Sequence, residues 1–267
     1  MKEDGPEQPL SAKTALAIAD PQLLEVLDLM DSVATEREAI PTIDQFAWGL
    51  FWRCRRLVEA IQAVLAIRMP SEAMILARAL AESSLVLHEL AHASPDVRIA
   101  KLAWWANQSM AEMADLERLS ERLQPSDSEE RAFEIRNAIA DRQESLRRYA
   151  DRHGVETYAK VTSRQSPKDL LEELGPSKDR WLFELADGMV HGNEAALFSY
   201  RVTGENQVGW TLRVSSPGEY LGAAAFTCRS ALRATRAFAK MADIDLPRSI
   251  NAVEIRAEEL DEPPEQP

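Results

Sequence analysis

Two histidines and a glutamate stand at a spacing that could hold a metal ion. His88, Glu89 and His92 form the pattern His-Glu-x-x-His, and on a helix the two imidazoles would lie on one face, one turn apart. Such a pair can bind Zn²⁺, with the glutamate as the base that activates a metal-bound water. The pattern continues as Ala-Ser-Pro95, without a following Gly and third His. Zinc is therefore an alternative, and the simpler interpretation is two histidines that the dipole favours at a helix C-terminus. We expect no other cofactor.

A second candidate pair lies nearer the C-terminus. Asp187 and His191 are also one turn apart on a predicted short helix, and Gly192 is suited to end that helix. A carboxylate beside an imidazole can orient a general base. An equally ordinary role is structural, with the imidazole bonded to a backbone carbonyl. Both interpretations stay open.

The third candidate pair is Arg78 and Glu82, on the clearest helix of the sequence, predicted for residues 71–92. On a helical wheel this pair shares an arc of about 120° with the histidine pair, and the opposite arc is apolar. Apolar residues also interrupt the polar arc, whereas a freely solvated face would more often carry Lys and Gln. We therefore predict a partly buried polar stripe in which Arg78 and Glu82 form an i,i+4 ion pair.

The elements that would position these residues are mostly helices. Ten glycines are few for 267 residues, and alanine and leucine abound, which favours helices over a β fold with many turns. We predict an all-α fold (mainly), a multi-helix bundle. Asp20-Pro21 and Ser216-Pro217-x-Glu219 are typical helix starts. The predicted helices begin at about residue 20 and span about 41–68, 71–92, 96–123, 127–149, 167–174, 177–191 and 217–241.

One stretch breaks the helical pattern. Residues 197–203 and 207–214 alternate between apolar and polar side chains, and Gly204-Glu205-Asn206 joins them. This pattern predicts one small β-hairpin, at about residues 197–214, inserted before the last long helix. We further predict a flexible N-terminal arm at 1–19, a single helical domain at 20–246 and an acidic flexible tail at 247–267.

Composition excludes several classes of protein. Hydrophobic residues make up 45% of the chain, enough for a sizeable core, and the formal net charge is −13. Generic nucleic-acid binding and binding to anionic membranes both need a basic surface, so neither is expected. No apolar run approaches the roughly 20 residues that span a bilayer, and no secretory signal is visible. Cys54 and Cys228 have no ligand or redox spacing, so we expect buried, reduced thiols in a cytoplasmic protein.

Two segments carry a family resemblance. One reads Leu76-Ala-Arg78-Ala-Leu-Ala-Glu82, and the other reads Trp181-Leu-Phe-Glu-Leu-Ala-Asp-Gly-Met-Val-His191-Gly192. Together they resemble a large bacterial helical family of unknown function, DUF5677, over about residues 45–240. Its members pair an Arg-x-x-x-Glu helix with a later Tyr-x-x-x-Ser-x-x-Val-His segment. The resemblance implies an all-α domain in which Arg78, Glu82 and His191 approach one another, and it implies no established activity. Asp187 stands where the family often has Ser, and Phe183 where it often has Tyr.

A weaker resemblance is to the helical ribonucleases of bacterial conflict systems, whose motif is an Arg, four to six residues, and then a His. The matching places before His191 hold Glu184, Leu185 and Ala186, so the Arg of that motif is missing. Arg78, on another helix, would have to supply the guanidinium.

Two hypotheses about function therefore stand side by side. The first is a binding or interaction module, in stress or defence, in which Arg78, Glu82, Asp187 and His191 line a pocket or hold the bundle together. The second is a hydrolase, either an RNA-cleaving enzyme that uses His191 and Arg78 or the zinc enzyme described above. The partner would be a protein or a small molecule, and a homo-oligomer stays open.

Overall fold

The computed structural model describes residues 11–35, 44–98, 101, 166–174, 177–191, 201–204, 207–210 and 216–260, with single helical positions between 133 and 152. The chain divides into two compact units. One unit is formed by residues 1–91 and 166–267, and the other by residues 92–165. Each unit is described by itself.

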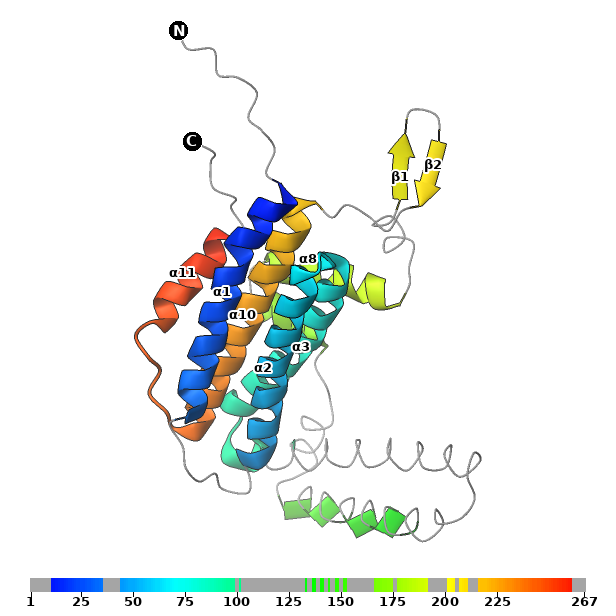
Figure 1. The fold of residues 1–267 in the computed structure, drawn as a ribbon. Helices are drawn as coiled ribbons and strands as arrows, with labels where there is room; N and C mark the ends of the chain where they lie inside the picture. The colour runs from blue at the N-terminus through cyan, green and yellow to red at the C-terminus, as the bar shows by residue number, and fades with distance from the viewer. Residues whose placement is uncertain are drawn as a thin grey trace. The chain divides into compact units, whose positions relative to one another are not determined.

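Helices form the framework of the first unit, and the central one is α10 (Pro217–Ala242). It packs against α1, α2, α8 and α11, and Figure 1 shows α1 running beside it, with α11 on the outer side. The other helices described in this unit are α1 (Ala12–Thr35), α2 (Asp44–Ala66), α3 (Pro70–His92), α7 (Pro167–Leu174), α8 (Ser177–Val190) and α11 (Ile250–Glu259).

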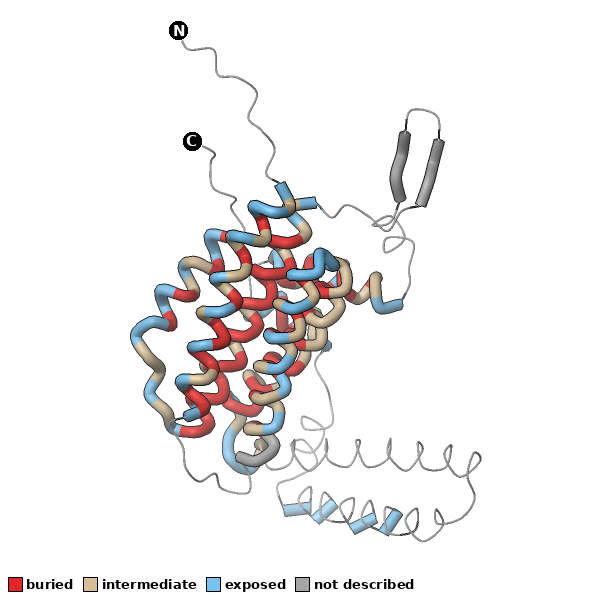
Figure 2. Tube along the Cα trace, viewed as in Figure 1, coloured by how far each residue is buried: buried red, intermediate tan, exposed pale blue. Residues whose placement is uncertain are grey.

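The core lies where these helices face one another (Figure 2). Phe238 of α10 stacks on Phe51 of α2 with ring centroids 4.4 Å apart, and Trp48 lies 5.5 Å from the same ring. Large rings in offset contact add attraction beyond their buried area. Small side chains let neighbouring helices approach α10 closely, and its buried alanines include Ala223, Ala224, Ala225, Ala231, Ala234, Ala237 and Ala239.

Both cysteines lie in this core. Cys54 and Cys228 are free and fully buried, which confirms the predicted buried thiols. Burial disfavours the thiolate and raises the pKa of each thiol to about 12.

Several predicted helices are confirmed with their boundaries. The helices α3, α7 and α8 begin and end within a residue of the predicted positions. The start of α10 is also as predicted, because the Ser216 side chain accepts a hydrogen bond from the Glu219 backbone N–H at 3.3 Å. Local sequence favours the starts of α3, α7 and α10, because each has a proline at its first position and a serine side chain caps α7 and α10.

The start of the first helix was predicted wrongly. It begins at Ala12, inside the predicted flexible arm, and Pro21 lies within it. Ser11 caps it, accepting a hydrogen bond from the Thr14 backbone N–H at 3.1 Å. Asp20 is therefore no cap, and its carboxylate instead accepts a hydrogen bond from the Gln62 side chain at 2.7 Å. Packing of α1 outweighs the loss of one backbone donor at Pro21.

The predicted flexible tail is also wrong as far as Glu259, because α11 forms there. Its apolar positions Ile250, Val253 and Ala257, with Leu260 just after it, are buried. Their spacing of three and four residues is that of one helix face. The surrounding residues of this segment are strongly charged, so its apolar face is the feature of the sequence that indicates packing against the bundle.

The predicted fold class needs a correction as well. The fold is all-α, and the β-hairpin predicted for residues 197–214 is not a layer of it. Two four-residue strands, β1 (Arg201–Gly204) and β2 (Gln207–Trp210), pair antiparallel with Arg201 opposite Trp210. Independent sheets need more strands or a packed partner, so the helices set the fold class. The rest of the predicted range lies outside the described residues.

The second unit is described at fewer positions. Residues 95–98, Lys101 and single positions between 133 and 152 are helical. They fall inside the helices predicted for 96–123 and 127–149, whose other residues lie outside the described ones. Across the described parts of both units, no helix is both long and apolar enough to cross a membrane.

Candidate functional site

Three helices of the first unit bring charged side chains to one place. The helix α3 carries Arg78 and Glu82 one turn apart, and α8 carries Asp187 near its C-terminal end. Lys168 comes from the first turn of α7, which packs against α8. We call Arg78, Glu82, Lys168, Asp187 and His191 the polar cluster.

Arg78 is the inner member of the polar cluster. Its Nη2 lies 2.9 Å from Asp187 Oδ1 and 3.1 Å from Glu82 Oε1. Its guanidinium carbon lies 5.3 Å from the centre of the Phe183 ring, a cation–π contact. The side chain is 19% exposed, and its buried Nε has no hydrogen-bond partner among the described residues. Arg78 thus joins α3 to α8 with charge and with an aromatic contact.

Asp187 is the member at which the other charges meet. Besides Arg78, its carboxylate has Lys168 Nζ at 3.7 Å and His191 Nε2 at 3.6 Å. His191 is 67% exposed and Lys168 is 40% exposed, whereas Asp187 is 27% exposed. The polar cluster therefore has a half-buried inner side and an open outer side.

This arrangement combines groups that do different chemistry. An imidazole can accept or donate a proton near neutral pH. An ammonium and a guanidinium can hold an anion. The His191 imidazole adds attraction to Asp187 only when it is protonated, because a neutral ring carries no charge.

The sequence named every member of the polar cluster except Lys168, but it did not show that Arg78, Lys168 and His191 meet at Asp187. The predicted Arg78–Glu82 ion pair is present. Arg78 and His191 meet through Asp187, since each has its ion pair with the same carboxylate oxygen. Lys168 was missed, because a lysine on a separate helix gives no local signal of what it contacts. Phe183 had no predicted contact, although its spacing of four residues before Asp187 places both on one face of α8.

The histidine pair on α3 lies at the C-terminal end of that helix. His88 and Glu89 are half-buried and His92 is exposed. Within the described ranges, no three His, Cys, Asp or Glu side chains are grouped so that they could hold a metal ion. Zinc binding by His88 and His92 stays a prediction.

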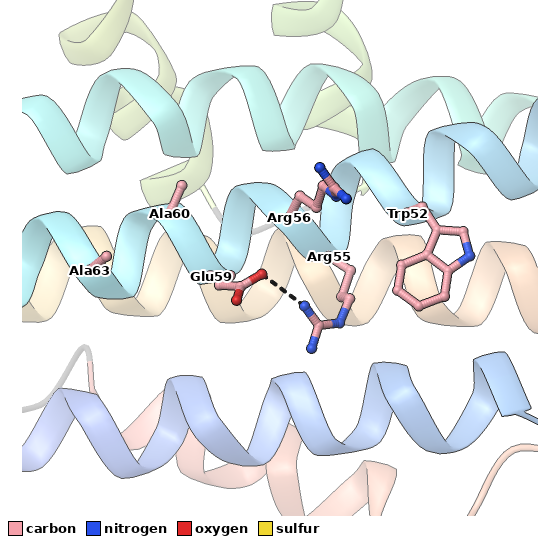
Figure 3. Close-up of a pocket in the computed structure, with 6 residues that line it drawn as sticks. All are labelled: Trp52, Arg55, Arg56, Glu59, Ala60 and Ala63. Carbon is pink, nitrogen blue, oxygen red and sulfur yellow. Dashed lines mark hydrogen bonds and ion pairs between the residues drawn. The ribbon is translucent and has the colours of Figure 1, made fainter.

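A groove on α2 is the other candidate feature of this unit (Figure 3). It encloses about 660 Å³ and is lined by Trp52, Arg55, Arg56, Glu59, Ala60 and Ala63, all from one helix. Arg55 is engaged already, with two hydrogen bonds to Asp31 at 2.6 and 2.9 Å and one to Glu59 at 2.9 Å. The hydrogen bond to Asp31 raises the pKa of Arg55. Because its main cation is neutralised, the groove is a weaker candidate than the polar cluster.

Comparison with known proteins identifies the family. No curated protein and no solved structure matches the chain. The model of a family of unknown function, DUF5677, matches residues 44–208. The matched segment includes α2, α3, α7 and α8, and therefore every member of the polar cluster. The chain belongs to this family of unknown function, DUF5677.

Proposed function

We propose that the chain is a binding module and that its ligand contacts the open side of the polar cluster. One observation carries the proposal: the Asp187 carboxylate has three basic side chains near it, Arg78 of α3, Lys168 of α7 and His191 at the end of α8, and the last two are exposed. A purely structural ion pair would need neither of those two, because Arg78 alone already joins α3 to α8.

The unused hydrogen-bond donors indicate an anionic ligand. An ammonium has three N–H donors, and Lys168 has one carboxylate within 4 Å among the described residues, at the long distance of 3.7 Å. The His191 ring likewise lies beyond hydrogen-bond distance of Asp187, at 3.6 Å. A phosphate or carboxylate group that replaced water here would accept from both side chains.

RNA cleavage is the second candidate, and the open imidazole of His191 beside a carboxylate and two cations favours it. An acid–base imidazole together with cations that stabilise a developing phosphate charge is what phosphodiester cleavage requires. The Asp187–His191 pair and the nearby Lys168 and Arg78 provide these groups.

Phosphate titration tests the binding proposal. Inorganic phosphate is added to the full chain while the imidazole NMR signals are recorded, and His191→Ala assigns the signal of that ring. We expect a saturable shift of the His191 signal, and binding about tenfold weaker in Lys168→Ala, equal to about 1.4 kcal/mol. Arg180→Ala, which removes a cation elsewhere on α8, is the control. Equal phosphate binding by wild type and Lys168→Ala would contradict the proposal.

Incubation with a single-stranded RNA oligonucleotide separates the two candidates. If the chain is an enzyme, wild type cleaves the RNA and His191→Ala loses the cleavage. If it is a binding module only, neither protein cleaves. Equal cleavage by both would come from a contaminating nuclease and would count against a role of His191 in catalysis.

A further inference from the structure

A second group of charges lies deeper in the same unit, at the other end of α8. Asp179, in the first turn of α8, is fully buried. Its Oδ1 accepts a hydrogen bond from Arg229 Nε at 2.6 Å, and its Oδ2 accepts one from Arg233 Nη2 at 3.2 Å. Arg233 also donates from Nη1 to Ser84 Oγ at 3.4 Å. Because Arg229 and Arg233 belong to α10 and Ser84 to α3, these contacts join three helices.

Because these charges are buried, only a narrow range of positions of α8 keeps them paired. Arg229 is 10% exposed and Arg233 is 11% exposed. Burial lowers the pKa of Arg233, while the charge of Asp179 acts in the opposite direction. A buried carboxylate that loses its partners is strongly destabilising, so other positions of α8 that would separate Asp179 from the two arginines are disfavoured.

Spacing connects this group to the polar cluster. Asp179, Phe183, Asp187 and His191 follow one another at intervals of four residues, so they form one stripe along α8. A shift of α8 by one residue would rotate this stripe by about 100° and move it by about 1.5 Å. Asp187 would then no longer face Arg78. Apolar contacts such as those of Phe183 are not directional, whereas hydrogen bonds from two guanidinium groups are.

We propose that Asp179 is a positioning residue for the polar cluster. Through Arg229 and Arg233 it sets the rotation and height of α8, and it thereby holds Asp187 and His191 opposite Arg78. Its importance for ligand binding rests on the proposed function, but the positioning itself does not.

The test uses the imidazole NMR signals of the full chain in the absence of ligand. The chain has four histidines, so His191→Ala identifies the signal of that ring, and Asp187→Asn shows where the signal moves without the carboxylate. We expect Asp179→Asn to move the His191 signal toward its position in Asp187→Asn. Arg180→Ala is the matched control, because the neighbouring Arg180 pairs at the surface with Glu184 of the same helix and with Glu172 of α7, and it should leave the signal in place.

A milder variant, Arg233→Lys, tests the proposal if Asp179→Asn does not fold. Arg233→Lys keeps the charge but loses the forked donor that reaches both Asp179 and Ser84, and we expect a smaller shift of the His191 signal in the same direction. If either variant folds and leaves the His191 signal at its wild-type position, Asp179 only stabilises the fold and the proposal is overturned, even where the melting temperature falls.

Phosphate titration of Asp179→Asn separates this proposal from the binding proposal. If both hold, Asp179→Asn moves the His191 signal and also weakens phosphate binding about tenfold, as Lys168→Ala does. If Asp179→Asn moves the signal while Lys168→Ala binds phosphate as wild type does, the positioning role stands and the binding proposal fails.

Discussion

At the scale of single residues, Arg78 is the charge that α3 and α8 share. Its Nη2 lies within ion-pair distance of the Glu82 and Asp187 carboxylates, and its guanidinium carbon lies 5.3 Å from the centre of the Phe183 ring. Glu82 and Asp187 are each only about a third exposed or less. Without Arg78, both carboxylates would remain half-buried, one of them without a cation among the described residues.

Arg78→Met should therefore destabilise the protein. We expect the free energy of unfolding to fall by about 1–3 kcal/mol, because the change leaves a half-buried carboxylate unpaired but not fully desolvated. Urea denaturation followed by circular dichroism measures the change. Arg180→Ala, which breaks ion pairs at the surface, should leave the midpoint unchanged. A midpoint of Arg78→Met equal to that of wild type would show that Arg78 contributes nothing to the fold.

At the scale of elements, α11 is held to the bundle by apolar contacts and by two ion pairs. Arg236 of α10 forms two parallel hydrogen bonds with Glu254, at 2.5 and 2.6 Å. Arg256 bonds to Glu25 of α1 at 2.7 Å. The hydrogen bonds from Arg236 lower the pKa of Glu254 below its ordinary value of 4.5.

This direction predicts how stability changes with pH. Since the pKa of Glu254 is lower in the folded state than in the unfolded state, its contribution is complete above pH 4.5 and is lost as the pH falls through the folded pKa. Glu254→Gln should therefore melt at a lower temperature than wild type at neutral pH, and the two should converge in acid. Melting temperatures across the acid range measure this. The control is Glu258→Gln, an exposed position of α11, and a constant gap between Glu254→Gln and wild type would refute the prediction.

At the scale of the whole molecule, the family segment is only part of the fold. Residues 44–208 match the family model, but α1, α10 and α11 lie outside that range. The central helix α10 provides the Phe238 ring that stacks on Phe51. It also provides the two arginines that bond to the buried Asp179.

A chain cut to residues 44–208 should not fold as the full chain does. It would expose the face of α2 that packs on α10 and would leave the Asp179 carboxylate without its two arginines, a loss that a unit of this size cannot offset. We expect no cooperative melting transition by circular dichroism, whereas residues 11–260 should melt as the full chain does. Cooperative melting of 44–208 near the temperature of the full chain would show that the segment is independent.

Sequence alone determined those features that depend on near neighbours in the chain. The starts of α3, α7 and α10 follow from prolines and capping side chains, because a helix end needs only local hydrogen bonds. The Arg78–Glu82 pair likewise follows from a spacing of four residues. The same local logic failed at α1 and α11, whose charged or Pro-containing sequences form helices because apolar faces pack on the bundle.

Only the tertiary structure decided which distant side chains meet. Arg78 and Asp187 are separated by many residues, as are Asp179 and its two arginines. No local pattern encodes a contact between helices that are far apart in the sequence. Lys168 reaches Asp187 because α7 packs against α8. The sequence therefore supplied the charges of the polar cluster, and the contacts of α8 with α3, α7 and α10 determined that Asp187 is its centre.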